Sequence, residues 1–409
     1  MMRIAYIVPY VPNLIRTRPY NFILQLVDLG HKVEVFTLGS NEQDHADIQT
    51  LRNKGAIVHY FELPVWRSLV NSALAVPGWQ PLQTVYSWHA GLAHQIAERA
   101  ADKDFDVVHV EHLRGSRYGL YLKSRIASQP VVWDSVDCIS HLFEQASSQS
   151  RNWFGRFVTR FELPRTRRAE GQLICSFDQA LVTSAADREA LLRLLPAGKY
   201  PAPISVLPNG VDLDYFHPNP DIERDAGMIV FSGKMSYHAN ISMAKYLVGE
   251  IMPLVWRSRP DAKLFIVGKD PTTEVIGLGQ NHLITVTGTV SDIRPYLWRA
   301  AVSVVPLLYG AGIQNKILEA MATATPVITS PRAITALRIV PGKDLSVADN
   351  AVEFSQQILR LIDDFDLMKQ IGGAGEVYVR KHHNWRSITL QLLDIYMKVI
   401  TSSATASRL

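Results

Sequence analysis

The sequence predicts an α/β protein with two Rossmann-like, doubly wound domains that face a cleft. Three observations lead to this fold class. Short β-branched runs alternate with helical stretches in both halves of the chain, the pattern of a parallel sheet covered by helices on both faces. The turn-rich segment LPNGVDLDYFHP, residues 207–218, separates the two series. A chain of 409 residues also exceeds one ordinary core. We therefore expect domains at 1–206 and 207–384.

Six strands are expected in the first half, each a short run rich in β-branched or aromatic residues. They are Ile4–Val8, Lys32–Phe36, Ile57–Phe61, Val107–Val110, Val131–Trp133 and Ala180–Thr183. Between the first two strands, Phe22, Leu26 and Leu29 recur at helical spacing, and Gly30 ends that helix. Ligands of such sheets bind at the carboxyl ends of the strands, so the loops there carry the candidate residues.

The second half repeats the alternation with six more strands. They are Met228–Ser232, Leu264–Val267, Ile284–Thr287, Val302–Val305, Val327–Thr329 and Leu345–Val347. Helices are expected at Ile241–Arg257, Asp292–Arg299, Ile313–Ala324, Glu353–Asp364, Leu367–His382 and from Trp385 to about Ser402.

Composition excludes several function classes. A net charge of +4 is too small to indicate a nucleic-acid partner by itself, so none is expected. Two cysteines, Cys138 and Cys175, have no metal-ligand spacing and cannot form a disulfide framework. The first residues, MMRIAYIVPY, resemble a strand more than a signal peptide, and no apolar stretch reaches the length of a membrane helix. We expect a cytoplasmic protein.

The most informative segment is YGAGIQNKILEAMATATPVITS, residues 309–330. A glycine turn leads into a helix that carries Lys316 and Glu319 one turn apart, and a buried strand follows. The amino terminus of a helix and a lysine suit a phosphate, and a carboxylate one turn along suits a ribose diol. An ordinary surface ion pair between the two side chains is the alternative.

Six segments in order resemble a known family. They are LGHKVEVF (29–36), LPNGVDLDYF (207–216), SGKM (232–235), AKLFIVG (262–268), NKILEAMATATPVITS (315–330) and GKDLSVAD (342–349). Together they resemble the glycosyltransferases of the GT-B architecture, specifically the retaining family four. The turn GIQNK is similar to that of a bacterial subset associated with exopolysaccharide or envelope sugar transfer.

The resemblance implies an activity and a division of labour. The carboxyl half would bind a nucleoside diphosphate sugar, and the amino half would hold a carbohydrate or lipid-linked acceptor. The last helix, 385–409, would pack back on the first domain. A hexose-type sugar would be transferred with retention, and neither a cofactor nor an obligatory metal is expected. A helix amino terminus, Lys316 and Lys234 would stabilise the departing diphosphate instead, and Glu319 would accept hydrogen bonds from the ribose.

One residue departs from the family pattern. The family's paired acids are separated by seven residues, and where the first would stand this chain has Ala311. Either backbone amides and a neighbouring side chain hold the sugar, or donor turnover is poor. A non-catalytic GT-B scaffold that keeps a nucleotide site is therefore the second hypothesis. The further donor contacts that we expect are Gly310, Gly312, Ile313, Gln314, Asn315, Gly233 and Asn240.

The amino half carries its own candidates. His112 follows the strand DVVHV and is a candidate acceptor or sugar contact with a catalytic role, whereas His109 inside the strand is expected to be core. Arg16 and Arg18 lie in the first loop. They are candidates to reach the diphosphate or an anionic acceptor, or simply to solvate the loop. Asp134 and Asp137 follow another strand and are candidates to line the acceptor site.

A membrane surface is a further candidate partner. Residues 151–168 are rich in arginine, and the aromatic residues of 151–161 recur on one helical face. Basic residues with aromatic anchors suit an anionic membrane, and would place the protein on the inner face of the cell membrane. A face that is simply core is the alternative. The apolar stretch around Trp66, Trp79 and Trp88 is a second candidate, for a lipid-linked acceptor.

Overall fold

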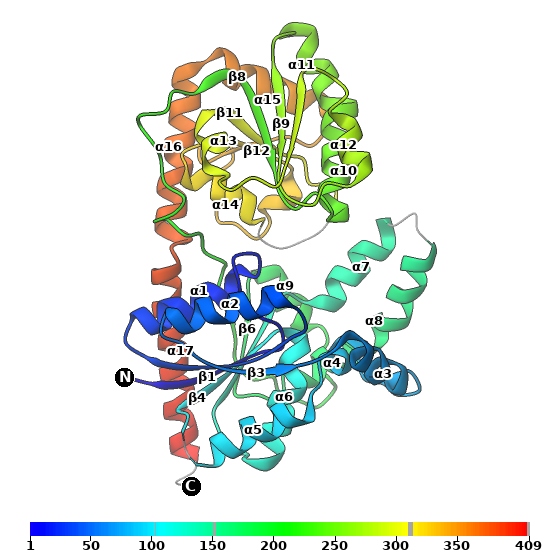
Figure 1. Cartoon of the computed structure of the whole chain (residues 1–409), viewed down its shortest axis with the longest axis vertical. Helices are drawn as coiled ribbons and strands as arrows, with labels where there is room; N and C mark the ends of the chain where they lie inside the picture. The colour runs from blue at the N-terminus through cyan, green and yellow to red at the C-terminus, as the bar shows by residue number, and fades with distance from the viewer. Residues whose placement is uncertain (103, 150–152, 310–313, 407–409) are drawn as a thin grey trace. The chain divides into compact units, whose positions relative to one another are not determined.

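The computed structural model describes residues 1–102, 104–149, 153–309 and 314–406, with side chains except at 145–158 and 406. The chain folds as two compact units (Figure 1). Unit 1 contains Met1–Pro208 and Trp385–Leu409, and unit 2 contains Asn209–Asn384. The division falls close to the boundaries expected from the sequence.

Unit 1 is built on a seven-stranded parallel sheet of order β3-β2-β1-β4-β5-β6-β7. The strands are β1 (Arg3–Val8), β2 (Lys32–Gly39), β3 (Ile57–Glu62), β4 (Val107–Glu111), β5 (Val131–Val136), β6 (Gln179–Val182) and β7 (Ile204–Val206). The first six lie where the sequence places them. The seventh was not predicted, because it has only three residues and follows the proline-rich stretch PAP at 201–203.

Helices cover both faces of this sheet. They are α1 (Thr17–Asp28), α2 (Glu42–Asn53), α3 (Val65–Ala75), α4 (Leu82–Tyr86), α5 (Ala90–Ala101), α6 (His112–Arg125), α7 (Ile139–Gln149), α8 (Trp153–Leu173), α9 (Ala185–Leu192) and α17 (Trp385–Ala406). Alternate residues of β1 enter two different cores: Ile7 packs with α5 and α6, whereas Ile4 and Tyr6 pack with α1, α2 and α17. Figure 1 shows α1 and α2 on one side of the strands and α5 and α6 on the other.

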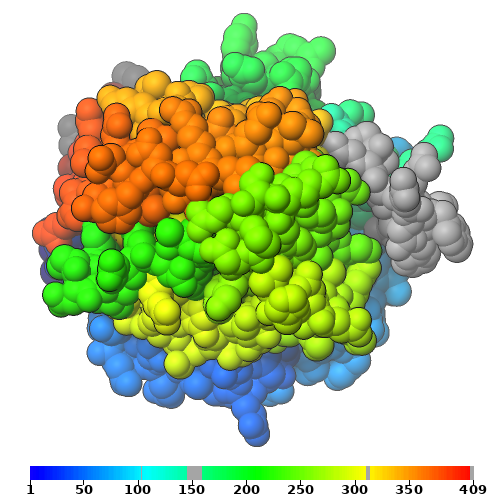
Figure 2. All heavy atoms as spheres, turned by 90° about the horizontal axis from the view of Figure 1, so that it is seen from above, coloured from blue at the N-terminus to red at the C-terminus, as the bar shows by residue number. Residues whose placement is uncertain are grey.

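Unit 2 has a six-stranded parallel sheet of order β10-β9-β8-β11-β12-β13. The strands are β8 (Asp225–Ser232), β9 (Lys263–Val267), β10 (Ile284–Gly288), β11 (Ala300–Val305), β12 (Val327–Thr329) and β13 (Ser346–Val347). The helices are α10 (His238–Tyr246), α11 (Met252–Ser258), α12 (Thr273–Leu278), α13 (Arg294–Arg299), α14 (Asn315–Ala322), α15 (Ala351–Asp363) and α16 (Phe365–His382). Figure 2 shows α15 and α16, in orange, beside the yellow-green α10 and α11.

One predicted helix of unit 2 is wrong in detail. The sequence predicts a single helix over Ile241–Arg257, but α10 begins at His238 and a π-helical turn over Leu247–Ile251 separates it from α11. Pro253 stands in the first turn of α11, and its missing backbone N–H cannot continue the regular hydrogen-bond ladder. The early start brings the first turn of α10 next to the end of β8.

The predicted fold class is confirmed: two Rossmann-like α/β units, each with a parallel sheet. No helix among the described residues is long and apolar enough to cross a membrane.

Candidate functional site

Two glycines shape the carboxyl edge of the sheet in unit 2. Gly233 follows β8 and Gly268 follows β9, with φ of +151° and +148°. A Cβ atom on Gly268 would overlap the backbone oxygen of Gly233. A Cβ atom on Gly233 would lie 2.7 Å from Nδ2 of Asn240 and 3.0 Å from Nζ of Lys316. Only glycine tolerates both the positive φ and these short distances. At this edge of the sheet the backbone of Gly233 therefore lies close to the Lys316 ammonium.

Lys316 is the buried cation of this edge. It lies in the first turn of α14, with 9% of its surface exposed, and its Nζ donates to Oδ1 of Asn240. Its ammonium stands 5.0 Å from the centroid of the Phe231 ring. Burial lowers the pKa of Lys316 to about 8, and nearby Glu319 partly opposes that change. Within the described parts of the chain, no carboxylate forms an ion pair with it.

Asn240 fixes the position of that lysine. Its Nδ2 donates to the backbone oxygen of Lys234 over 2.8 Å while its Oδ1 accepts from Lys316. One amide therefore joins α10, the loop after β8 and α14. The side chain of Lys234 points elsewhere: it is about half exposed, and its Nζ lies 3.6 Å from Asp270.

Glu319 lies one turn further along α14. Burial raises its pKa to about 7, and the nearby Lys316 ammonium works against that rise. Among the residues that the structure describes, no side chain or backbone N–H donates to this carboxylate, and its distance from Lys316 exceeds that of an ion pair. The alternative of an ordinary surface ion pair is therefore wrong. A half-buried carboxylate without a donor suits a ligand that supplies hydroxyl groups.

The amino terminus of α14 completes this region. Gln314 is the N-cap residue, and its side chain makes no capping hydrogen bond. The first N–H groups of a helix lack partners within the helix and favour an anion. Gln314 and Asn315 are both half-buried at this end. Gly310, Ala311, Gly312 and Ile313 lie outside the described residues.

Two contacts at this edge were not predicted. The imidazole of His238 stacks on the ring of Tyr309 at 5.5 Å and 2°, and the Tyr309 hydroxyl bonds to His238 and to Ser242 at 3.0 Å each. The second is the Phe231 ring beside Lys316. Gly268 was also missed, although the sequence held a signal for it, since a glycine follows the strand directly in VGK as in SGK. The stacked pair of His238 and Tyr309 joins residues that no sequence pattern relates.

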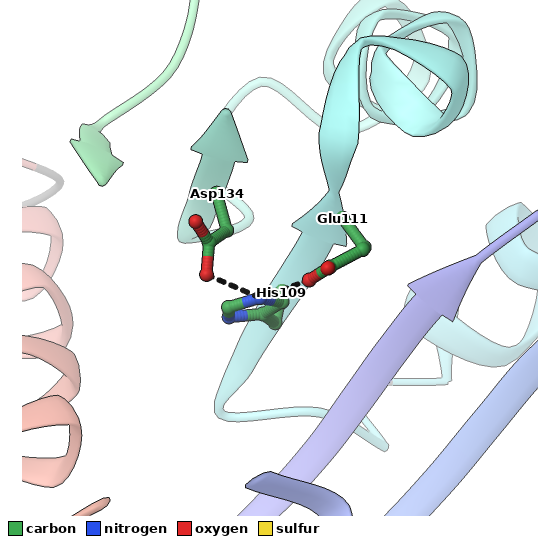
Figure 3. A group of neighbouring side chains, drawn as sticks. All are labelled: His109, Glu111 and Asp134. Atoms are coloured by element: carbon green, nitrogen blue, oxygen red, sulfur yellow. Dashed lines mark ion pairs between the residues drawn. The ribbon is translucent and has the colours of Figure 1, made fainter. Parts of the chain in front are cut away.

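Unit 1 holds a buried polar cluster at the ends of β4 and β5. Nε2 of His109 lies 3.5 Å from Oε2 of Glu111 and 3.7 Å from Oδ2 of Asp134, and Figure 3 shows the two carboxylates approaching the ring from β4 and β5. Nε of Arg18 lies 2.8 Å from the same Asp134 oxygen. All four side chains are at most 4% exposed.

This cluster corrects two predictions. Arg18 and Asp134 were expected to face a ligand, and the alternative for Arg18 was a solvated loop. Instead they form a buried ion pair, and Nη1 of Arg18 also donates to the backbone oxygens of Leu207 and Pro208. The reason is that Arg18 begins the buried face of α1, so it points into the core rather than into the loop. His109 is core, as expected.

Two tyrosines connect the cluster to other elements. The Tyr6 hydroxyl of β1 donates to Glu111 over 3.1 Å, and the Tyr396 hydroxyl of α17 bonds Nδ1 of His109 over 2.8 Å. Burial, reinforced by the carboxylates, raises the pKa of both hydroxyls. The ligand atoms of His109, Glu111 and Asp134 lie within 4.8 Å of one another, close enough to hold a metal ion. The Arg18 guanidinium already supplies a cation at this point, so we assign the cluster to the attachment of α17.

His112 has an unusual backbone and a neutral ring. It directly follows β4 as the first residue of α6, with φ of +61°, because no connecting residue separates strand from helix. Its backbone oxygen accepts from Nε1 of Trp133 over 3.3 Å. Burial lowers the pKa of His112 to about 4, and its buried Nδ1 has no hydrogen-bond partner among the described residues. Such strain and an unpaired polar atom are the features that mark functional positions.

The remaining candidates of unit 1, Arg16 and Asp137, make no ion pair with the buried cluster among the described residues. Arg16 is exposed, donates from Nη1 to the backbone oxygen of Val11 over 3.0 Å and lies 4.6 Å above the Tyr10 ring. Asp137 is half-buried and accepts from the Thr183 hydroxyl over 3.2 Å. Burial, with the nearby Asp187 carboxylate, raises the pKa of Asp137 to about 7. The aromatic side chains at 153–158 lie outside the described residues.

Comparison with known proteins identifies the family. Residues 16–215 match the family described as Glycosyltransferase Family 4, and residues 226–364 match Glycosyl transferases group 1. The chain is a glycosyltransferase. The resemblance to glycosyltransferases seen in the sequence is thereby confirmed, whereas the retaining mechanism and the subset indicated by the turn GIQNK stay predictions.

Solved structures share the fold of this glycosyltransferase over nearly its whole length. Sucrose-phosphate synthase from Thermosynechococcus elongatus superposes with a TM-score of 0.72 at 16% identity, covering 98% of this chain and 100% of that one. Anabaena HepE in complex with UDP and glucose gives 0.67 at 14% identity, covering 97% and 100%. At such identities these structures show the GT-B fold alone.

Two curated relatives match over part of their length. An α-maltose-1-phosphate synthase of Mycolicibacterium smegmatis is 26% identical over 256 residues, which are 54% of this chain and 63% of that protein. An uncharacterized protein of the Klebsiella pneumoniae cps region is 20% identical over 39% of this chain and 43% of that protein. The chain therefore spans less than two thirds of either relative.

Proposed function

We propose that this glycosyltransferase transfers a hexose-type sugar, with retention, from a nucleoside diphosphate sugar to a carbohydrate or lipid-linked acceptor. The observation that carries the proposal is Lys316: a buried ammonium without a carboxylate partner in the described chain, at the amino end of α14 and beside Gly233. A buried cation of this kind is unfavourable until an anion joins it. A diphosphate is an anion of suitable size for a helix amino terminus.

The donor chemistry follows from the same groups. As the bond between the sugar and the diphosphate breaks, negative charge grows on the phosphate oxygens, and Lys316 and the first N–H groups of α14 stabilise it. Asn240 holds the ammonium in place throughout, and the exposed Lys234 is available to the outer phosphate. The acceptor oxygen attacks on the face that the diphosphate leaves, which retains the configuration, and the acceptor proton passes to the departing phosphate. These groups perform the task of a divalent metal, so none is required.

The nucleoside is proposed to be uridine. Glu319 would accept hydrogen bonds from the two ribose hydroxyls, because its carboxylate lacks any donor in the described chain. Structures similar in fold were determined with UDP, with UDP-glucose and, for an Escherichia coli protein, with UDP-2-fluoro glucose. The sugar would be held by Gln314 and by backbone amides of 310–313, because Ala311 offers no carboxylate.

In unit 1, His112 is the proposed contact to the sugar or acceptor. Its neutral ring, with a pKa of about 4, can accept a hydrogen bond from a hydroxyl throughout the physiological pH range. Asp137 and the exposed Arg16 are the further acceptor-side candidates. Arg18 and Asp134 are no longer proposed as ligand contacts, because each is engaged by the other.

Donor hydrolysis tests the proposal directly. The purified protein is incubated with UDP-sugars and GDP-sugars, with and without a chelator, and release of the nucleoside diphosphate is measured. We expect release from a UDP-sugar that the chelator does not abolish. Lys316→Ala should lower it by orders of magnitude, whereas Lys369→Ala, at an exposed lysine of the same unit, should not. Near-normal turnover of Lys316→Ala would refute the assigned role.

A non-catalytic scaffold is the second candidate, and Ala311 is the observation that favours it. Calorimetry with UDP, run beside the hydrolysis assay, separates the two functions. Binding of UDP without hydrolysis of any donor, and without transfer to supplied acceptors, would identify a scaffold. Absence of both UDP binding and donor hydrolysis would refute the proposed nucleotide site itself.

A further inference from the structure

The large apolar residues of helix α3 in unit 1 face away from the protein. Ser68 is its one buried residue, and Asn71 also faces the protein, since its Nδ2 donates to the backbone oxygen of Trp88 over 3.0 Å. A helix that only covers a core turns its large apolar residues inward. Here they point outward. Those with 45% or more of their surface exposed, in or just after α3, are Val65, Trp66, Leu69, Val70, Leu74 and Val76.

A basic corner, formed by Arg165 and Arg168 around Trp79, adjoins this apolar face. Trp79, 61% exposed, follows α3 closely, and the guanidinium groups of Arg165 and Arg168 each lie 5.8 Å from its ring. Arg165 also donates to the backbone oxygens of Val76 and Gly78, which anchors the corner to α8. In Figure 1, α3 lies beside α4 at one end of unit 1, near α8.

A cavity opens beside Trp79 and carries uncompensated positive charge. It has a volume of about 690 Å³, and its lining includes Arg117, Arg168 and Lys199 but no aspartate or glutamate. In the described chain none of these three cations forms an ion pair. Arg117 is half-buried with its guanidinium over the Trp88 ring, and burial lowers its pKa. Arg168 and Lys199 are exposed, so Arg117 is the partly desolvated cation of the three, and such a cation without a carboxylate partner favours a bound anion.

We propose that α3, residues 76–79 and this cavity form one docking surface for an anionic phospholipid membrane. The apolar face of α3 enters the interfacial layer, the tryptophans lie at the headgroup level, and the cavity binds a lipid phosphate. Outward apolar residues bordered by cations are the composition that binds such surfaces. The inference goes beyond the proposed function, and it places the membrane contact on α3 rather than on the segment 151–168 alone.

A second copy of the chain is a poorer occupant of this surface. In a two-fold dimer the same patch meets itself, so the unpaired cations around Trp79 would approach those of the other copy. Like charges without intervening anions oppose that contact. An anionic lipid surface instead satisfies the apolar face and the cations together.

Flotation of the full chain with lipid vesicles tests the proposal. The vesicles contain phosphatidylcholine alone or mixed with phosphatidylglycerol, at low and high salt. We expect binding to the anionic vesicles at low salt, weaker binding at high salt and little binding to neutral vesicles. Leu69→Ser with Leu74→Ser, and separately Arg117→Gln with Arg168→Gln, should each weaken binding tenfold or more. The matched control is Val377→Ser with Leu390→Ser, exposed apolar residues elsewhere, which should bind as wild type.

Each other outcome overturns the proposal. These are absence of binding to anionic vesicles at low salt, equal binding to neutral ones, or variants that bind as wild type while their melting temperatures match that of the control. Sedimentation without lipid addresses the second copy: an oligomer that Leu69→Ser with Leu74→Ser dissociates would assign the face to self-association. Calorimetry with inorganic phosphate addresses the free anion. If phosphate binding produces heat that the Arg117→Gln with Arg168→Gln variant abolishes, while the protein binds none of the vesicles, the cavity would be assigned to a soluble phosphate compound.

Discussion

Replacing Lys316 by methionine should separate binding from stability. The pKa of this lysine falls from 10.5 to about 8. At about 1.4 kcal/mol for each pKa unit, burial therefore disfavours the charged ammonium by roughly 3 kcal/mol. Methionine removes that penalty and also removes the hydrogen bond to Asn240, worth about 1.5–3 kcal/mol. The two changes largely cancel, so the free energy of unfolding of the apo protein should change by no more than about 1.5 kcal/mol.

Nucleotide affinity should respond very differently to the same substitution. A charge-assisted contact to phosphate in a desolvated position contributes about 2–4 kcal/mol, so the Kd for UDP should rise by roughly 30-fold or more. Calorimetry with UDP gives the affinity, and urea denaturation without ligand gives the stability. The control is Lys369→Met, because Lys369 also lies over an aromatic ring, that of Phe365, but is exposed. It should leave both quantities unchanged.

Two results would contradict this reasoning. If Lys316→Met binds UDP as tightly as the wild type, the buried lysine does not bind phosphate. If the variant loses several kcal/mol of stability while Lys369→Met does not, Lys316 is held for the fold and its burial indicates no ligand.

Four further predictions follow from the same geometry. Gly233→Ala should weaken UDP binding at least tenfold, because a Cβ atom would press on the amide and ammonium nitrogens 2.7 and 3.0 Å away, whereas Gly373→Ala, where the space is open, should bind UDP normally and be slightly more stable. Calorimetry and thermal denaturation check both. His112→Gly should be about 1 kcal/mol more stable than His112→Ala, because glycine adopts the positive φ without strain, and both variants should lose turnover. Equal stability of the two variants would refute the inference that the backbone of His112 is strained. UDP affinity should rise as the pH increases through about 7, where Glu319 ionises, and Glu319→Gln should abolish that rise and weaken binding about tenfold at pH 7.5, below the pKa of about 8 at which Lys316 loses its charge. Since its raised pKa keeps the free carboxyl protonated below 7, an affinity independent of pH between 6 and 7.5 would refute its role. Tyr396→Phe should destabilise the protein by about 1–3 kcal/mol in urea denaturation, because a buried imidazole nitrogen loses its partner; a change under about 0.5 kcal/mol would be inconsistent with the cluster as the attachment of α17.

The secondary structure of this chain is largely predictable because its signals are local. A buried parallel strand reads as a β-branched run wherever it stands, so β1 and β8 could be placed from a few residues each. Local signals failed where the element was too short or its ladder was interrupted. The three-residue β7 and the π-helical turn at Leu247–Ile251 are the examples.

The candidate site was predictable as a set of residues but not as an arrangement. Lys316 and Glu319 could be paired because they are three residues apart on one helix. The contact between Lys316 and Asn240 spans 76 positions, and the ion pair of Arg18 with Asp134 spans 116. No pattern in one sequence relates such distant residues, so Asn240 was expected to bind the donor itself and Arg18 to face a ligand. Burial decides both, and burial is a property of the folded chain.

The attachment of α17 to the cluster around His109 has a consequence for biosynthesis. Trp385, Ile388, Leu392 and Tyr396 complete the core on one face of the first sheet. The ribosome adds them only after it has made every residue of unit 2. During that interval, the nascent sheet exposes an apolar face and an unpaired imidazole, which is the kind of surface that chaperones recognise. Unit 2 can therefore finish folding before unit 1, although unit 1 emerges first.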